Sequence, residues 1–412
     1  MKVLQLSSYC KPEVLASPYL NENLREEIVK AGMEMSVLVP CPSRNVSAEV
    51  RKAYKTKKVE TFYDGKLLIY RFPLMKEGRN PILRAIRYFV QCFKQFYYVR
   101  FTQIGRECDV LLSSSTPPIL PPLVSYLSNV TGKPFVYDLQ DIFPDSLAGT
   151  GLAKKGGLLF KIGNMIANYG YKHADKIIVI SEDFKKNIMA KGVPRDKIEV
   201  VYNWVDENAV HPVAKEDNPL FEEFGLSREE FTVVYAGNLG NAQNINIIVD
   251  AAKQLSDIRF ALFGTGGLEE ELRSQIAKKQ LANVHLNPLQ PFERVSLVYS
   301  LGDACIVSCK AGLGGSAMPS KTWSIMSCGR PVVASFDEGE LKDILESNNC
   351  GIFSHAGNVQ EFVDAIKTLQ EAPERCKEMG INARQFIMDN LTKEVGTKKY
   401  VDIIRSVVEH DG

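Results

Sequence analysis

The segment LGGSAMPSKTWSIMSCGRPVVAS, from Leu313 to Ser335, decides the fold because it joins a flexible loop, a helix start and a buried strand. Its signals are two loop glycines, an N-cap, a helix-ending glycine, a proline stop and an apolar strand: Gly314 and Gly315, Ser320, Gly329, Pro331 and Val332–Ala334. Lys321 falls in the first helical turn, where free backbone N–H groups suit a phosphate. Taken alone, the segment favours an ordinary capped helix, and only its surroundings favour a ligand site.

Length and composition indicate two domains with balanced charge. The 412 residues exceed one ordinary core, so two domains of about 200 residues each are expected. The 50 Lys and Arg against 49 Asp and Glu give a net charge of +1, which does not favour nucleic acid as a partner. The nine cysteines form no CxxC pair, and the amino terminus MKVLQLSSY shows no signal-peptide pattern. We therefore expect reduced thiols and a cytosolic location.

Short β-branched runs alternate with helical stretches in both halves of the chain, a pattern typical of parallel sheets. The polar segment Asp206–Glu230 interrupts the alternation and indicates a linker with a short helix. We predict an α/β fold of two doubly wound, Rossmann-like domains, residues 1–205 and 206–392, with a C-terminal helix near 393–412 that packs back on the first domain. Ligands bind outside the carboxyl ends of such strands, so the two domains are expected to face a central cleft that holds the site.

Two glycine-rich turns follow strands predicted in the second domain. Strand Thr232–Ala236 runs into GNLGNAQN at Gly237–Asn244, and strand RFALFG runs into Gly264–Gly267. Each turn alone is a weak signal, because glycine often serves only backbone geometry. Both turns and the helix start at Lys321 would share one rim of the sheet, which favours a nucleotide diphosphate over three independent structural turns. The sequence lacks P-loop, GxGxxG, GxSxG and HExxH motifs, so kinase and dehydrogenase functions are disfavoured and no metal site is indicated.

Three acids, Asp138, Asp141 and Asp145, lie at or just beyond the carboxyl end of strand FVYDL in the first domain. Beside a cleft they would position an acceptor hydroxyl or act as a base. Equally, Asp141 or Asp145 would cap the turn before a helix.

The segment Arg79–Arg106 carries basic and aromatic residues and no acid. A basic aromatic helix indicates an anionic membrane surface, and we take Arg84, Arg87 and Lys94 as its membrane-facing candidates. A packed helix with its aromatics in the core and its arginines solvated explains the pattern equally well.

The motifs in their order along the chain resemble retaining glycosyltransferases of family 4 with the GT-B fold, in particular the bacterial surface-polysaccharide, fucosaminyltransferase-like branch. The matching motifs are MKVLQLSSYCKPE at Met1, TPP at Thr116, DIFPDS at Asp141, ADKIIVISEDF at Ala174, VYNWVD at Val201, YAGNLGNAQN at Tyr235, FGTGGLEEEL at Phe263 and PSKTWSIMSCGRPVVAS at Pro319. The resemblance covers almost the whole chain.

The resemblance implies that the second domain binds a nucleotide sugar, usually a UDP-sugar, and that the first binds the acceptor. The donor-binding residues it implies are Gly237, Asn238, Leu239, Gly240, Gln243, Gly264, Thr265, Gly266, Ser316, Met318, Pro319, Ser320 and Lys321. Lys321 offsets charge on the departing diphosphate, and Asp141 and Asp138 join it as catalytic candidates. No cofactor and no metal are expected, and the chain has no DxD motif.

The chain departs from the family pattern at four positions. Ser316 and Ser324 stand where two glutamates are usual, and Asn238 and Gln243 stand where an arginine and a lysine are usual in the first donor loop. Positive charge for the diphosphate must then come largely from Lys321 and from backbone amides.

The sequence thus predicts a metal-independent, retaining glycosyltransferase of the hexosyltransferase class. The expected reaction moves a sugar, possibly an N-acetylated deoxyhexose, from a UDP-sugar to a polyprenyl-diphosphate-linked saccharide in capsule or lipopolysaccharide O-antigen synthesis. The expected location is the cytoplasm, with peripheral association to the cytoplasmic face of the inner membrane. The alternatives are a non-catalytic nucleotide-sugar-binding assembly subunit, favoured by the missing glutamates, and a GT-B-fold nucleotide-sugar epimerase.

Overall fold

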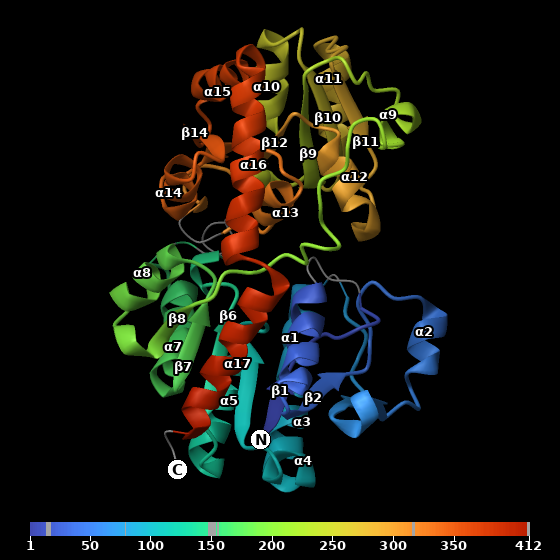
Figure 1. Cartoon of the computed structure of the whole chain (residues 1–412). Coiled ribbons are helices and arrows are strands. Elements are labelled where there is room, and N and C mark those ends of the chain that lie inside the picture. Colours follow the sequence, from blue (N-terminus) through green and yellow to red (C-terminus); the bar gives the residue numbers. More distant parts are fainter. Residues whose placement is uncertain (14–17, 79, 147–153, 155, 315–317, 410–412) are drawn as a thin grey trace. The chain divides into compact units, whose positions relative to one another are not determined.

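The computed structural model (Figure 1) describes residues 1–13, 18–78, 80–146, 154, 156–314 and 318–409. The chain divides into two compact units, Met1–Tyr202 with Gly396–Gly412, and Asn203–Val395. Each unit contains one sheet, and all but one of the strand pairings in the described residues are parallel. The two doubly wound α/β units predicted from the alternating pattern are therefore present.

The first unit contains an eight-stranded sheet of order β3-β4-β2-β1-β5-β6-β7-β8. Its strands are β1 (Lys2–Leu6), β2 (Glu34–Pro40), β3 (Val59–Phe62), β4 (Leu67–Phe72), β5 (Val110–Ser114), β6 (Phe135–Leu139), β7 (Lys176–Val179) and β8 (Ile198–Val200). The edge strand β3, which the sequence pattern did not predict, pairs antiparallel with β4. The central strands are buried on both sides, as their continuous apolar runs require.

Helices follow most strands of the first unit. They are α1 (Pro18–Lys30), α2 (Ala48–Ala53), α3 (Pro81–Phe101), α4 (Gln103–Arg106), α5 (Leu120–Thr131), α7 (Leu158–His173), α8 (Glu182–Ala190) and α17 (Lys393–Glu409), with short 3-10 turns at Tyr63–Gly65 and Arg195–Lys197. The uncharged run after Val110 forms β5 and α5, and prolines occupy the first turn of α5, where no intrahelical N–H is lost. No described helix is long and apolar enough to cross a bilayer.

The second unit contains a six-stranded sheet of order β11-β10-β9-β12-β13-β14. Its strands are β9 (Thr232–Asn238), β10 (Arg259–Thr265), β11 (Val284–Asn287), β12 (Ala304–Ser308), β13 (Val332–Phe336) and β14 (Gly351–His355). Its helices are α9 (Leu220–Glu223), α10 (Asn246–Gln254), α11 (Glu269–Lys278), α12 (Val295–Ser300), α13 (Lys321–Ser327), α14 (Glu340–Ser347), α15 (Val359–Glu371) and α16 (Pro373–Asn390), with 3-10 turns at Asn241–Gln243 and Phe292–Arg294. The strand order reverses between β9 and β12, and the turns that follow these two strands therefore lie at a topological switch point.

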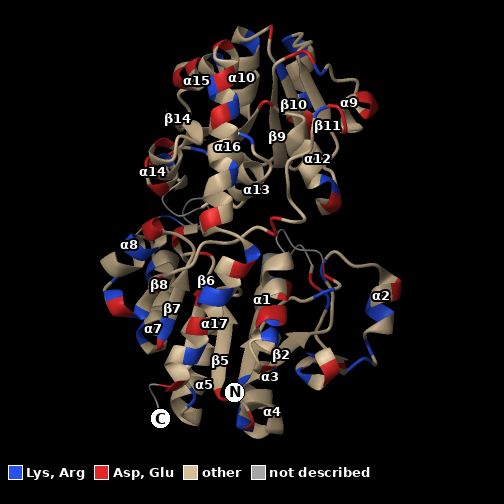
Figure 2. Cartoon of the chain, in the orientation of Figure 1, with Lys and Arg blue, Asp and Glu red and all other residues tan. Residues whose placement is uncertain are grey.

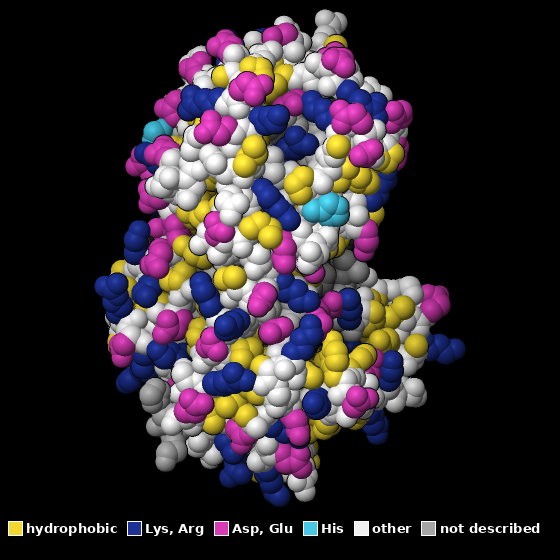
Figure 3. All heavy atoms as spheres, viewed as in Figure 1, with side chains coloured by type: hydrophobic (Ala, Val, Ile, Leu, Met, Phe, Trp, Pro, Cys, Tyr) yellow, Lys and Arg dark blue, Asp and Glu magenta, His cyan; other side chains and the backbone are white. Residues whose placement is uncertain are grey.

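Acidic and basic residues are mixed along the ribbon of both units (Figure 2). Hydrophobic, acidic and basic side chains are interspersed on the face seen in the space-filling view (Figure 3). All nine cysteines fall within the described residues and are unpaired, and all but Cys41 are buried.

The C-terminal helix α17 is tied to the first unit through Asp138 at the end of β6. The Tyr400 hydroxyl on α17 donates to Asp138 Oδ1 at 2.8 Å, and the side-chain amide of Gln140 donates to the same oxygen at 2.7 Å. Burial raises the pKa of Asp138 to about 6, in spite of these two donors. The carboxyl group that anchors α17 therefore binds its proton more strongly in the folded chain than in the unfolded chain.

This shift predicts how stability depends on pH. The stabilisation from the Asp138 proton is fully present below about pH 4, the range of an unperturbed Asp, and is lost as the pH rises through about 6. We expect Asp138→Asn to remove this loss, so the thermal midpoint of the variant relative to wild type should rise between pH 4 and pH 7. Asp402→Asn, at an exposed position on α17, is the control. A constant difference across this range would contradict the assignment.

Candidate functional site

Lys321 opens helix α13, and its ammonium group lies over the first glycine-rich turn of the second unit. Nζ is 4.1 Å from the centroid of the Tyr235 ring on β9, a cation–π distance. The Tyr235 ring is fully buried, and its hydroxyl donates to the carbonyl of Asn238 at 2.7 Å. The strand end therefore fixes the ring, and the ring fixes the position of the ammonium group.

The ammonium group of Lys321 has no hydrogen-bond partner among the described residues, although its nitrogen is buried. Burial lowers the pKa of Lys321 to about 8. A buried charge is unfavourable unless an opposite charge or hydrogen-bond acceptors compensate it. The arrangement is therefore suited to receive an anion, the chemistry predicted for this residue from the sequence.

Gly237 gives Lys321 the space for this position. Its φ of +139° is strained for residues with a side chain, and a Cβ built there would lie 2.8 Å from Lys321 Nζ. The glycine is thus needed for backbone conformation and for the close approach of the ammonium group. The structure brings these two predicted donor-site residues into direct contact.

The glycines of the second turn serve a different purpose. A Cβ on Gly264 would lie 2.4 Å from the carbonyl oxygen of Gly237, and a Cβ on Gly266 would lie 2.4 Å from that of Leu239. Leu239 N–H donates to the carbonyl of Thr265 at 3.0 Å, which locks the two turns together. Gly264 and Gly266 are therefore explained by packing between turns, the structural alternative to a direct contact with the nucleoside.

The polar residues of the first turn pair with one another. The side-chain amide of Asn238 donates to Gln243 Oε1 at 3.3 Å, and a Cβ on Gly240 would lie 2.8 Å from Asn238 Nδ2. Ser308, at the end of β12, donates to the carbonyl of Gln243 at 2.6 Å. The two amides that replace the usual basic residues thus brace the turn, and Lys321 places a cation beside it.

The loop before α13 is held by Asp337, whose Oδ2 accepts from the backbone N–H groups of Gly312 at 2.8 Å and Gly314 at 2.7 Å. Ser316 lies outside the described residues, Met318 is buried and Pro319 is partly exposed. At the other end of α13, Gly329 has φ +64° and terminates the helix as predicted.

Ser320 occupies the position before α13, but its side chain does not cap the helix. Its own φ and ψ are helical, at −55° and −25°, and its side chain accepts no hydrogen bond from the first turn. The N–H groups of Thr322 and Trp323 instead bond to the carbonyls of Pro319 and Ser320 in a tight turn. The capping role predicted for the Ser320 side chain is wrong, because the backbone satisfies these donors. Ser324, on the same helix, is partly buried.

The three acids of the first unit have different hydrogen-bond and ion-pair partners. Asp138 anchors α17, and Asp145 forms an ion pair with Lys191. Asp141 is exposed, its N–H donates to Ser115 Oγ at 3.1 Å and its Oδ2 accepts from the Ser146 hydroxyl at 3.1 Å. Asp141 therefore keeps one carboxylate oxygen without a partner among the described residues, and the catalytic roles of Asp141 and Asp138 stay predictions.

Arg84 and Lys94 lie on α3 as predicted, with Arg84 exposed and Lys94 donating to the carbonyl of Pro73 at 2.6 Å. Arg87 does not face outward. It is 1% exposed, and its guanidinium donates to Ser43 Oγ at 3.0 Å and to the carbonyl of Met75 at 3.1 Å. The membrane-facing assignment of Arg87 is wrong because the helix turns this side chain into the protein.

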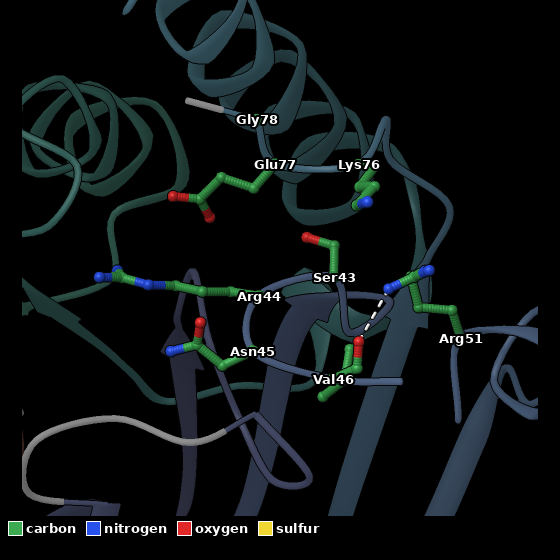
Figure 4. A pocket seen from close by; sticks show the side chains of 8 residues that line it. All are labelled: Ser43, Arg44, Asn45, Val46, Arg51, Lys76, Glu77 and Gly78. Atoms are coloured by element: carbon green, nitrogen blue, oxygen red, sulfur yellow. Dashed lines mark hydrogen bonds between the residues drawn. The ribbon is translucent and has the colours of Figure 1, made fainter. Parts of the chain in front are cut away.

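A polar pocket of about 620 Å³ lies beyond the carboxyl ends of β2 and β4 in the first unit. Figure 4 shows Ser43 near its centre, with Lys76 and Arg51 on one side and Glu77 and Arg44 on the other. Among the described residues, no carboxylate forms an ion pair with any of its three cations. Sequence reasoning missed this pocket, because its charges come from two segments about thirty residues apart, one of which includes Arg51 on helix α2.

The single acid of this pocket is engaged by the protein. Glu77 Oε2 accepts from the Tyr9 hydroxyl at 2.9 Å and lies 3.9 Å from the Arg87 guanidinium. The Arg44 guanidinium stacks over the Tyr9 ring at 5.2 Å, and Arg51 donates to the carbonyl of Val46 at 2.8 Å. The pocket therefore presents an excess of positive charge to solvent.

The described residues hold no cluster of three or more His, Cys, Asp or Glu side chains arranged as metal ligands.

Two different family models match the chain, one over most of each unit. Residues 20–209 match the model of Glycosyltransferase Family 4, and residues 217–386 match the model of Glycosyl transferases group 1. The chain is 23% identical to the "Probable glycosyltransferase WbjE" of Pseudomonas aeruginosa, over 82% of this chain and 84% of that protein. It is also 23% identical to the "Putative colanic acid biosynthesis glycosyl transferase WcaI" of Escherichia coli K12, over 98% and 100% of the two chains.

Solved structures share the fold over the full length. Anabaena Alr3699/HepE, crystallised in complex with UDP, has a TM-score of 0.74 at 18% identity and covers 98% of this chain and 100% of its own. The sucrose-phosphate synthase of Thermosynechococcus elongatus has a TM-score of 0.77 at 15% identity, with 99% of each chain covered. Fold and site define a GT-B protein with an anion-receptive turn. The chain is a glycosyltransferase, built from a Family 4 domain followed by a group 1 domain.

The packing of the two glycine turns yields a stability prediction. Gly264→Ala would force a Cβ against the Gly237 carbonyl, whereas Gly267 has open space around the corresponding position. We expect Gly264→Ala to lower the free energy of unfolding of the second unit by about 1–3 kcal/mol, and Gly267→Ala to change it little. Urea unfolding of both variants measures this. Equal stability of the two variants would contradict the packing role.

Proposed function

We propose that the protein transfers a sugar from a UDP-sugar to a saccharide linked to polyprenyl diphosphate, in the synthesis of a surface polysaccharide. The observation that carries the proposal is the buried ammonium of Lys321 against Gly237, which has no hydrogen-bond partner in the described part of the chain. Structures titled as complexes of Anabaena HepE with UDP and with UDP-glucose support the choice of donor. The similarity over the full chain to WcaI, named as a putative colanic acid biosynthesis glycosyl transferase, supports a role in polysaccharide synthesis.

In the proposed reaction, the bond between the anomeric carbon and the β-phosphate oxygen of the donor breaks, and UDP leaves with the bonding electrons. A bond forms between the anomeric carbon and an acceptor hydroxyl oxygen, which releases its proton. Negative charge grows on the leaving diphosphate, and a cation placed there stabilises the transition state more than the ground state. Lys321 takes this role, and the Asn238–Gln243 pair holds the turn beside it.

We infer from the sequence resemblance that the anomeric configuration is retained, that the transfer is independent of metal and cofactor, and that the sugar is an N-acetylated deoxyhexose, as in fucosaminyltransferase-like enzymes. The donor residues of the second unit are proposed to contact UDP through backbone amides of the first turn and through the segment around Met318, Pro319 and Ser320. In the first unit, Asp141 is the proposed group that receives the proton of the acceptor hydroxyl.

The polar pocket of the first unit, which contains Arg44, Arg51 and Lys76, is proposed to hold the phosphate groups of the acceptor. Arg44 and Lys76 are exposed side chains without carboxylate partners in the described residues, which leaves them available to an anion. Arginine in particular matches the geometry of phosphate oxygens. A lipid-linked acceptor also places the reaction at the cytoplasmic face of the membrane.

The donor role of Lys321 is tested by Lys321→Ala. We expect transfer from the UDP-sugar to fall at least tenfold, because the cation beside the leaving diphosphate is lost. The variant should be at least as stable as wild type, since it removes a buried charge without a partner. Lys253→Ala, at an exposed position on α10, is the matched control. Near-normal transfer by Lys321→Ala in a donor panel would remove Lys321 from the mechanism, and isomerised donor as sole product would indicate an epimerase.

The acceptor pocket is tested by Arg44→Ala and Lys76→Ala in an assay with a short-chain polyprenyl-diphosphate-linked saccharide. We expect KM for the acceptor to rise about tenfold or more, because a charge-assisted contact is lost, while KM for the UDP-sugar stays unchanged. Lys52→Ala, on the exposed helix α2, controls for loss of a basic side chain. An unchanged acceptor KM in both pocket variants would show that the phosphates bind elsewhere.

A further inference from the structure

Helix α3 turns its polar side toward the protein. Arg87, Gln91 and Gln95 are at most 1% exposed, and they recur at every fourth position along one side of the helix. Their donors reach strand β2 and the loops that follow β1, β2 and β4. Gln91 donates to Ser8 Oγ at 2.7 Å, and Gln95 to the carbonyls of Ser7 at 3.0 Å and of Leu38 in β2 at 3.1 Å. Arg87 donates to Ser43 Oγ at 3.0 Å and to the carbonyl of Met75 at 3.1 Å. These contacts fix the rotation of the helix about its axis.

The apolar side of α3 consequently faces solvent. Its side chains recur at intervals of three or four residues and are 44–71% exposed: Ile82, Ile86, Phe89, Phe93, Tyr97 and Phe101. Four of the six are aromatic. A row of this length is unlike the scattered single exposed apolar residues of ordinary surfaces.

A second row lies on α7. Leu158, Ile162, Met165 and Tyr169 are 39–75% exposed and also share one side of their helix. Helix α5 packs between α3 and α7: the Phe96 and Tyr126 rings are 6.2 Å apart, and the Ser125 hydroxyl donates to the carbonyl of Gly170 at 3.4 Å. The two rows therefore flank α5 on one side of the first unit, and we call them together the apolar face.

The charged side chains on the three helices of the apolar face are of one sign. None of the helices α3, α5 and α7 contains Asp or Glu. Arg84, Arg100, Lys161 and Lys172 are exposed cations on α3 and α7, and the Arg100 guanidinium lies 5.5 Å from the Phe101 ring centre. Aromatic side chains surrounded by Lys and Arg, without acids, complement the interface of an anionic lipid bilayer.

We propose that the apolar face docks the first unit onto an anionic bilayer, with its aromatic and aliphatic side chains at the level of the lipid headgroups. The inference deepens the proposed function, on which its biological purpose rests, because a polyprenyl-linked acceptor resides in such a bilayer. A second copy of the chain fits the face less well. A two-fold symmetric contact sets a patch against itself and would oppose cations to cations.

Vesicle flotation tests the proposal. The full-length protein is mixed with vesicles of phosphatidylcholine alone or with about one-third phosphatidylglycerol, a strongly anionic composition. We expect flotation with the anionic vesicles, weakened by salt, and at least tenfold weaker partitioning of the double variant Phe89→Ser/Phe93→Ser. The matched control is Leu289→Ser/Ile381→Ser, which changes two exposed apolar residues of the second unit and should float as wild type does.

Both altered phenylalanines are solvent-exposed, so the variant is expected to fold, and a thermal unfolding curve like that of wild type checks this. Flotation that is unchanged in Phe89→Ser/Phe93→Ser overturns the proposal. The proposal is also overturned if the wild-type protein does not float but forms a dimer, and the variant Phe89→Ser/Phe93→Ser is a monomer. If the wild-type protein does not bind UDP in calorimetry, the proposed function is contradicted instead, so the two failures are distinguishable.

Discussion

A buried ammonium group that has no counter-charge among the described residues is the feature on which the account of the second unit depends. Lys321 Nζ is held over the Tyr235 ring and against Gly237, where water is excluded and the protein supplies no acceptor from its described residues. The low pKa of about 8 records the unfavourable burial of this charge. A ligand with a diphosphate would supply the missing partner. In the proposed function, this missing charge arrives with the substrate and increases as the leaving group departs.

The surrounding fold keeps that ammonium group in place. Strand β9 ends in the Tyr235 ring and Gly237, β10 ends in Gly264 packed against the Gly237 carbonyl, and Asp337 holds the loop that leads toward α13. Each of these contacts joins residues at or just after the carboxyl ends of neighbouring parallel strands, on the same edge of the sheet. Gly237 lies against both Gly264 and Lys321, so a side-chain atom added at Gly264 is expected to disturb the backbone beside Lys321.

Much of this architecture was predictable from the sequence, and the predictions that were wrong or missing have physical causes. Strand alternation and the glycine turns are local patterns, so the two sheets and the position of Lys321 followed from them. The roles of Gly264 and Ser320 did not, because they depend on which backbone atoms meet them across the turn. The rotation of α3 was also hidden. The amphipathic pattern of α3 shows two faces but not which of them is buried. The distant backbone carbonyls that accept from Gln95 decide that the polar face, with Arg87, points inward.

Proton uptake on UDP binding tests the central claim most directly. Near pH 8 about half of the free protein carries Lys321 in its neutral form, and a diphosphate bound at Nζ would raise its pKa. Calorimetry in buffers of different ionisation enthalpy should then show uptake of roughly half a proton per UDP by wild type, and correspondingly less by Lys321→Met. Equal proton uptake by the two proteins, with UDP bound to both, would show that the diphosphate does not bind at this ammonium group.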